Sequence, residues 1–343
     1  MRRIKYSIKF LLASILFYSG FLRLYKILFF KNKAIILMYH RILGNSEHNH
    51  SYSHDGIIVN TNSFKKQIKF LSQNFNILTI DNFSTHIKEN KPFDGTSCLI
   101  TFDDGWHDNY KNAFPILKLY NTAAHIFLPV HFISNTDNFW QEKLNRYMSH
   151  ICYNPNLFSD FINNHHLQEF ILLEKTEIKI SIRNYISKLK ACSPEEIKHL
   201  LEQYETEMVA KNCMAPANEI DTYLNWPLIR KMQEDSISFG SHAISHHMLT
   251  KLDKHQLEHE LYESRRIIES QIGKTINSIA YPNGNHDKIV CSASKQAGYE
   301  LGFTTKHGYA TASTDPLRIP RINIHEDMTK YIPLFYCRIL GIF

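Results

Sequence analysis

Short apolar runs alternate with amphipathic helical patterns along most of the chain, and this alternation constrains the fold more than any other feature. Runs typical of buried strands lie at residues 34–40, 76–80, 97–102 and 123–129. Between the first two runs, the segment 63–75 places Phe64 and Ile68 on one face of a predicted helix. Strand, helix and strand in close succession predict parallel strands joined by right-handed crossovers.

The same alternation resumes after residue 222. Predicted helices occupy residues 226–235, 254–273 and 288–298. Further strands are predicted at residues 236–240, 275–282, 300–305 and 318–324. The total of about seven or eight strands suits a closed or partly closed β/α barrel. Residues 139–222, which separate the two halves, are polar and helix-prone, and we interpret them as a helical insertion.

The first 33 residues differ from the rest of the chain in charge and hydropathy. They carry eight Lys or Arg and no acid, around an apolar stretch at residues 10–22. This stretch is shorter than the roughly 20 residues that span a bilayer as a helix, and no signal-peptidase motif follows it. We expect residues 1–30 to associate with a membrane, either as a short anchor with snorkelling basic residues or as an interfacial helix on anionic lipid. The simpler alternative is a first helix packed against the body.

Outside this segment the charges nearly balance. The remaining chain has 31 basic and 33 acidic residues, so its composition gives no electrostatic reason to expect nucleic acid as a partner. The six cysteines have no close spacing, which argues against a disulfide framework or a cysteine zinc site.

Asp103 and Asp104 stand side by side at the end of the predicted strand 97–102. Two adjacent carboxylates repel each other, and burying each one away from water costs free energy. Either exposure to solvent or a nearby metal ion would lower this cost. Other polar residues follow predicted strands in the same way, namely His40, His242, the segment 280–284 and His325. Functional groups gather where parallel strands end, so we expect these residues to share one edge of the sheet.

His242 and His246 have the spacing H-x-x-x-H, which on a helix would turn both rings to one side. Two imidazoles and one carboxylate leave open positions on a zinc-like ion. A second carboxylate beside such a site can accept a proton from water. His255 and His259 share the spacing, but they lie in a charged helical pattern and are expected to be solvated.

Five ordered motifs resemble the polysaccharide deacetylases of the NodB-homology type, carbohydrate esterase family 4. They are ILMYHRI (36–42), TFDDG (101–105), SHAISH (241–246), AYPNG (280–284) and PRINI (320–324). The resemblance covers most of the chain outside the insertion and implies a distorted (β/α)7 barrel across residues 34–343. It also implies metal-dependent removal of an N-acetyl or other N-acyl group from a sugar of a cell-surface polysaccharide or a lipid-linked glycan.

Transferred to this sequence, the resemblance implies that Asp103 is the general base and that Asp104, His242 and His246 bind the metal. Zn²⁺ is the expected ion, with Co²⁺, Ni²⁺ and Fe²⁺ as alternatives. A backbone N–H near Asn283, where many relatives have Tyr, would help to stabilise the oxyanion.

Two further roles depend on how the chain departs from the family pattern. Many relatives have an Arg in the third motif that orients the base, whereas this chain has Ala280. Arg321 offers a guanidinium instead, with a structural salt bridge as the alternative. For the general acid we expect His40, which follows Tyr39 on the first strand, and His325 is the alternative.

Trp106 and Tyr281 either present a face to a sugar ring or fill the mouth of the barrel. Two other functions stay open: a carbohydrate-binding protein with little or no turnover, and a hydrolase of a non-sugar amide or ester. The expected location is a bacterial cell envelope. A spanning N-terminal segment would place the barrel outside the cytoplasm, and an interfacial helix would leave it inside.

Overall fold

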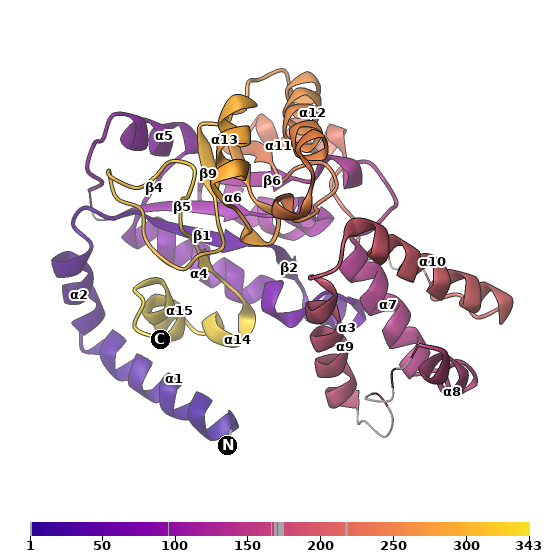
Figure 1. Cartoon of the computed structure of the whole chain (residues 1–343). Coiled ribbons are helices and arrows are strands. Elements are labelled where there is room, and N and C mark those ends of the chain that lie inside the picture. The colour runs from indigo at the N-terminus through magenta and orange to yellow at the C-terminus, as the bar shows by residue number, and fades with distance from the viewer. Residues whose placement is uncertain (1, 95, 166, 168–169, 171–174, 217–218) are drawn as a thin grey trace. The chain divides into compact units, whose positions relative to one another are not determined.

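Eight parallel strands form the main sheet of the residues that the computed structural model describes (Figure 1). The description covers the chain except residues 1, 95, 166, 168–169, 171–174 and 217–218. The strands are β1 (Ile35–Tyr39), β4 (Asn76–Ile77), β5 (Ser97–Phe102), β6 (Ala124–Leu128), β7 (Ile237–Ser241), β8 (Ser278–Ala280), β9 (Leu301–Phe303) and β10 (Ile322–Asn323). Their order is β10-β1-β5-β6-β7-β8-β9, with β4 also paired to β5.

The two ends of this order come close through a single segment. Ile319 forms a parallel bridge with Phe303 of β9, and Ile322 pairs with Leu37 of β1 three residues later. Residues 319–323 therefore pass from the last strand of the sheet to the first. The expected distorted (β/α)7 barrel is confirmed, since the sheet is parallel and this segment links its two edges.

Helices connect the strands as the alternation predicted. They are α4 (Thr61–Asn74), α5 (Ile80–Lys88), α6 (Phe114–Leu119), α11 (Trp226–Gln233), α12 (Lys254–Ile272) and α13 (Lys288–Gln296). The polar side chains that the sequence provides begin several of them. Asn60, Thr79 and Asp287 each accept a hydrogen bond from a backbone N–H in the first turn of α4, α5 and α13 respectively.

Some details differ from the sequence prediction. The strand predicted at 76–80 ends at Ile77. The reason is that Thr79 caps helix α5, which begins at Ile80. A short parallel pair, β2 (Arg41–Leu43) with β3 (Ile58–Asn60), was not predicted. Nor were α3 (Asn45–His50), α14 (Glu326–Thr329) and α15 (Ile332–Ile339).

The chain folds into two compact units. The first consists of residues 1–49, 55–135 and 223–343, and it contains every strand named above. Its core includes the apolar side chains of Ile36, Leu99, Phe127, Leu301 and Phe303, all of which are buried.

The second unit consists of residues 50–54 and 136–222. It is helical, with α7 (Trp140–Cys152), α8 (Pro155–Asn164), α9 (Lys175–Leu189) and α10 (Pro194–Ala210). Its own apolar core includes Leu144, Met148, Phe161 and Tyr204. The segment 139–222, which the sequence marks as an insertion, lies within this unit.

The N-terminal segment forms two helices, α1 (Arg2–Tyr18) and α2 (Phe21–Phe29), where the sequence suggested one. The break lies at Gly20, which has φ 80°, a left-handed conformation that glycine adopts at low cost. No single described helix is both long and apolar enough to cross a membrane. Together α1 and α2 meet that criterion, but they are bent by 76°.

Candidate active site

The end of β5 brings Asp103 and Asp104 to one edge of the first unit. The N–H of Asp103 still donates to the carbonyl of Tyr39 on β1, at 3.0 Å, so this residue continues the strand ladder. Asp104 has φ 73° and Gly105 has φ 59°, and these two left-handed residues turn the chain out of the sheet. A Cβ at Gly105 would lie 3.0 Å from Leu128 and 3.2 Å from Ile133, which explains the glycine.

The two carboxylates face different partners, which resolves the repulsion that their adjacency suggests. Asp103 forms a double hydrogen bond with the guanidinium of Arg321, at 2.7 Å from Nη1 to Oδ1 and 2.7 Å from Nη2 to Oδ2. Both side chains are buried. Arg321 also donates from Nε to the carbonyl of Thr304, which fixes the orientation of its guanidinium.

Asp104 faces two imidazoles instead. Its Oδ1 lies 3.4 Å from Nε2 of His242 and 3.4 Å from Nε2 of His246. The Nδ1 of His242 lies 2.7 Å from the carbonyl of Ala280, which can only accept a hydrogen bond. Nδ1 of His242 therefore carries a proton, and Nε2 is the ring nitrogen that faces Asp104 and His246.

The two histidines come together through a loop and not through a helix, so the helical reading of H-x-x-x-H is wrong. His242 directly follows β7, and its N–H donates to the carbonyl of Leu128. Ala243 has φ 62° and His246 has φ 57°, and this tight turn brings the rings within 4.9 Å between centroids. A regular helix cannot contain such residues.

The side chain of Glu260 on α12 holds this loop. Its carboxylate accepts hydrogen bonds from the backbone N–H of Ile244 at 2.7 Å, from that of Ser245 at 3.1 Å and from the Ser245 hydroxyl at 2.5 Å. Sequence reasoning did not identify Glu260, because its partners are backbone groups that no motif reveals.

The charges of the cluster shift its pKa values in opposite directions. Burial raises the pKa of Asp104, but hydrogen bonds from both imidazoles outweigh this and hold it well below its usual value. Burial likewise raises the pKa of Asp103, and the charges of Arg321 and His242 bring it below the usual value. Burial lowers the pKa of His246, whereas in His242 the two neighbouring carboxylates outweigh burial and raise it. Both aspartates are therefore carboxylates at neutral pH.

Asp104, His242 and His246 have the donor set of a metal site. Their three ligand atoms lie within 4.8 Å of one another, and among the described residues they are the group of acids, histidines and cysteines that meets this criterion. One carboxylate oxygen and two imidazole nitrogens suit zinc and similar divalent ions. The hydrogen bond from His242 to the Ala280 carbonyl is the kind of contact that orients a metal-binding histidine.

The two histidines considered as general acids lie at neighbouring strand ends. Nε2 of His40, which follows β1, is 3.9 Å from Oδ2 of Asp103. His325 follows β10, which pairs with β1, so the chain brings it to the same edge. Burial lowers the pKa of His325.

Trp106 holds the carboxylate of Asp104 by a hydrogen bond. Its indole Nε1 donates to Oδ2 of Asp104 at 3.1 Å, and its ring stacks on Tyr223 at 4.5 Å. The guanidinium of Arg41 lies 4.1 Å from the centroid of the Trp106 ring. Arg41 is in turn paired through Nε with Oδ2 of Asp108 at 3.0 Å.

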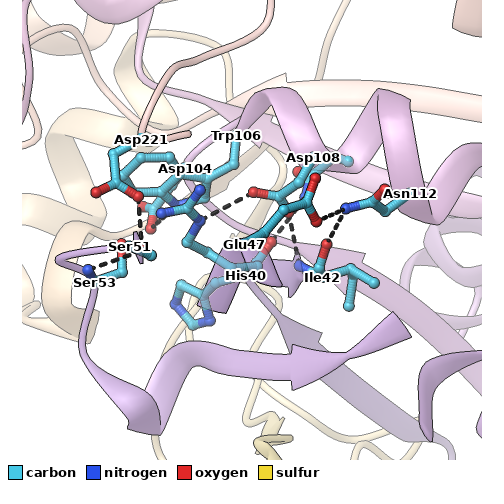
Figure 2. Close-up of polar contacts among 12 residues, drawn as sticks. His40, Ile42, Glu47, Ser51, Ser53, Asp104, Trp106, Asp108, Asn112 and Asp221 are labelled. Carbon is cyan, nitrogen blue, oxygen red and sulfur yellow. Dashed lines mark hydrogen bonds and ion pairs between the residues drawn. The ribbon is translucent and has the colours of Figure 1, made fainter. Parts of the chain in front are cut away.

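Figure 2 shows Asp108 beside this group, where its second oxygen accepts from the N–H of Ile42 at 2.7 Å. Asn112 in the same view donates to the carbonyl of Ile42 and to Glu47. Neither Arg41, which stands within the motif ILMYHRI, nor Asp108, which follows TFDDG, was assigned a role from the sequence.

Of the two interpretations of Trp106 and Tyr281, contact with a sugar ring finds no support in the structure, because both rings are fully buried. Packing, the other interpretation, describes them. Arg321 is also fully buried and so reaches Asp103 but no substrate. Asn283 is exposed after β8, with φ 56°. Asp104, Ala243, His246 and Asn283 are four of the eight non-glycine residues with positive φ in the described chain, a concentration of strain that is typical of functional sites.

Known proteins are similar to this chain over most of its length. The family profile of polysaccharide deacetylases matches residues 187–302. The poly-beta-1,6-N-acetyl-D-glucosamine N-deacetylase of Staphylococcus epidermidis is 26% identical over 325 residues, which cover 88% of this chain and 82% of that protein. The same enzyme of Staphylococcus aureus strain MRSA252 is 25% identical over 90% of this chain and 84% of its own length.

Two solved structures share the fold. The deacetylase PplD of Streptococcus pyogenes has a TM-score of 0.56 and 19% identity, over 87% of this chain and 94% of that one. IcaB of Ammonifex degensii has a TM-score of 0.56 and 14% identity, over 89% and 97%. The proteins that this chain resembles are deacetylases, which are hydrolases. The chain is therefore similar to polysaccharide deacetylases in its profile match, in its curated relatives and in its fold.

Proposed function

We propose that the protein is a metal-dependent deacetylase that removes N-acetyl groups from amino sugars of a bacterial cell-surface polysaccharide or lipid-linked glycan. The observation that carries this proposal is that the adjacent carboxylates of Asp103 and Asp104 have different partners. One carboxylate is paired with a guanidinium, and its neighbour faces two imidazoles. Such a pair provides a base and a metal ligand side by side.

Asp104, His242 and His246 would hold the ion, with Zn²⁺ as the first choice and Co²⁺, Ni²⁺ or Fe²⁺ as alternatives. When bound, the metal would supply Lewis acidity to the acyl carbonyl and to the attacking water. Trp106 and the Ala280 carbonyl support this role, because they orient Asp104 and His242.

Asp103 would take the proton of the attacking water. Its low pKa keeps it deprotonated, and the double hydrogen bond from Arg321 fixes both of its oxygens. Arg321 thereby takes the place of the third-motif arginine that this chain lacks. The N–H near Asn283 would stabilise the negative charge that develops on the acyl oxygen.

His40 would donate a proton to the departing amine. Its Nε2 lies within ion-pair distance of Asp103, so it stands beside the proposed base. His325 is the weaker candidate, because burial lowers its pKa and so disfavours the protonated form that an acid needs.

The proposed substrate rests on the names of the two staphylococcal relatives, which specify poly-beta-1,6-N-acetyl-D-glucosamine. β-1,6-linked N-acetylglucosamine oligomers are therefore the first substrates to test. We further propose that the enzyme works in the cell envelope at a membrane, to which residues 1–30 bring it.

The test combines metal content and acetate release on the full-length protein. The parent should bind one metal ion and release acetate, and the Asp104→Ala, His242→Ala double variant should lose both. His255→Ala, His259→Ala is the matched control, because this pair has the same spacing but is exposed on α12. Bound metal without acetate release from any acylated sugar would instead favour a carbohydrate-binding protein with little or no turnover. Release of the acyl group only from non-sugar amides or esters would favour a non-sugar hydrolase. No bound metal would refute the site.

A further inference from the structure

The first unit has an apolar surface on its two N-terminal helices. Of the 18 large apolar side chains that are exposed in the described chain, ten lie on α1 and α2. They are Ile8, Leu11, Leu12, Ile15, Tyr18, Phe21, Leu24, Ile27, Leu28 and Phe29. We call these ten side chains the N-terminal apolar face. Exposed apolar side chains that are contiguous, and not scattered, mark an interaction surface.

Helix α1 is apolar on two opposite sides. Its inner side carries Ala13, which is fully buried, and Phe10 and Phe17, which pack on Tyr331 at 4.7 Å and Tyr336 at 6.1 Å between ring centroids. Its outer side carries five of the ten exposed side chains, which recur at spacings of three and four residues between Ile8 and Tyr18. A helix that is apolar all round belongs in a protein core or in lipid, and this one has protein on one side only.

Helix α2 has the reverse of the usual arrangement. Its buried residues are Leu22 and Lys26, and the Lys26 ammonium donates to the carbonyl of Asn74 at 2.8 Å and lies 4.4 Å from the centre of the Phe75 ring. Leu24, Ile27 and Leu28 point outward and are more than half exposed. In water such a helix would place its charge outside and its leucines inside.

From these contacts we infer that the N-terminal apolar face docks onto an anionic lipid bilayer, with α1 and α2 lying in the plane of the membrane surface. The basic charge of residues 1–33, which carry eight Lys or Arg and no acid, complements anionic headgroups. The exposed phenylalanines and Tyr18 are residue types that settle at the interface between lipid and water.

The structure argues for docking and against spanning. Helix α1 is about 26 Å long and α2 about 13 Å, both shorter than a hydrocarbon core of about 30 Å. Figure 1 shows α1 beside α15, where the aromatic contacts of Phe10 and Phe17 hold it. The hydrogen bond of Lys26 holds α2 against Asn74 at the end of α4. A continuous span would require the bend of 76° to straighten and these contacts to break.

A second copy of the chain is a poorer occupant for this face. Each copy would bring its own eight cations to the contact without any acid from the same segment, so the two faces would repel each other. Phe10 of α1 packs on Tyr331, six residues after His325, at 4.7 Å between ring centroids. If the proposed deacetylase function holds, docking therefore keeps the substrate-processing edge near the bilayer and favours a membrane-held glycan.

The docking test measures vesicle binding of the full-length protein by flotation and does not require activity. Vesicles contain phosphatidylglycerol and phosphatidylcholine, or phosphatidylcholine alone. The test variant replaces four outward residues, Leu11→Gln, Ile15→Gln, Leu24→Gln and Leu28→Gln. We expect its partition coefficient on anionic vesicles to fall by more than about tenfold, since each substitution removes apolar area from lipid contact.

The matched control carries four equally exposed changes elsewhere, Leu119→Gln, Val209→Gln, Tyr262→Gln and Ile289→Gln, and should bind vesicles like the parent. Thermal unfolding of each protein confirms that it is folded. Binding that the test variant retains, or no binding by the parent, would overturn the inference. A parent dimer in solution that the test variant dissociates would assign the face to a second copy instead.

The depth of insertion separates docking from spanning. In Ile15→Trp, added tryptophan fluorescence should be quenched more strongly by lipids with a doxyl group near the headgroup than by lipids labelled near the bilayer centre. Stronger quenching by the deep label would show a spanning segment and refute the in-plane arrangement. A parent protein that binds vesicles but releases no acetate from acylated sugars would count against the proposed function and not against docking.

Discussion

Arg321 and Asp103 are 218 residues apart in the sequence, yet two hydrogen bonds of 2.7 Å join their side chains at the centre of the candidate site. The pair exists because the segment 319–323 passes from β9 to β1 and so carries Arg321 to the end of β5. A buried carboxylate that keeps its charge needs such a partner.

Replacing Arg321 tests this relationship. Arg321→Met leaves the Asp103 carboxylate buried without its cation, so we expect a loss of about 3 kcal/mol in the free energy of unfolding and a large fall in kcat. Denaturant unfolding and acetate release measure the two effects. Adding Asp103→Asn should restore much of the stability but none of the activity. Unchanged turnover in Arg321→Met would show that the pair is structural.

Trp106→Phe tests whether the indole positions Asp104. The substitution keeps an aromatic ring between Arg41 and Tyr223 but removes the N–H that donates to Oδ2 of Asp104. We expect the affinity for Zn²⁺ to fall about 10- to 100-fold, as is typical when a partner of a metal ligand is lost. Competition with a chelator gives the affinity directly. An unchanged affinity would reduce Trp106 to a packing residue.

Glu260→Gln tests the support of the histidine loop. The amide group of Gln would bring an N–H donor toward N–H groups of Ile244 and Ser245 that now share a carboxylate. We expect a loss of about 1 to 3 kcal/mol in stability together with weaker metal binding. Glu258→Gln, on the exposed side of the same helix and paired with Lys254, is the control and should change neither quantity. Equal effects of the two substitutions would contradict a role for Glu260 in the loop.

The sequence predicted the strands, which local patterns determine, and missed contacts between residues that are distant in the chain and that the sheet brings together. Strands β1 and β5 were predicted nearly to the residue, because continuous apolar runs are buried on both faces. The turn at Ala243 and His246 was not, because positive φ at non-glycine residues overrides a helix-like spacing. The resemblance suggested Arg321 as a partner of the base, but the approach of Arg41 and Glu260 to the site depends on packing that no motif records.

His40 and His325 can be distinguished by their pH profiles. A general acid must be protonated, so its loss should lower kcat by about 10²- to 10⁴-fold and remove the alkaline fall of activity. We expect this of His40→Gln, and only a small change in His325→Gln. Metal content must stay at the parent level in both variants for the comparison to count. The opposite pattern would transfer the role to His325.

The stability of the barrel should depend on His125 below neutral pH. This residue of β6 is buried between Ser238 and Ser278, whose hydroxyls lie 2.7 Å from its Nδ1 and 2.8 Å from its Nε2. Burial, with a smaller contribution from the charge of Arg321, lowers its pKa to about 3. The unfolded chain, with a pKa of about 6.5 at this histidine, therefore takes up a proton first as the pH falls.

His125 consequently costs no stability above pH 6.5 and destabilises the fold progressively below it, by about 1.4 kcal/mol per pH unit down to pH 3. His125→Asn should be less stable than the parent at pH 7.5, because it loses packing. Its free energy of unfolding should nevertheless fall less steeply, so that the difference between the two proteins shrinks by about 2 kcal/mol between pH 6.5 and pH 4.5. Urea unfolding at four pH values measures both curves, with His255→Asn on the exposed face of α12 as the control. Parallel curves for the parent and His125→Asn would show that His125 is protonated in the folded barrel, contrary to its burial between two hydroxyls.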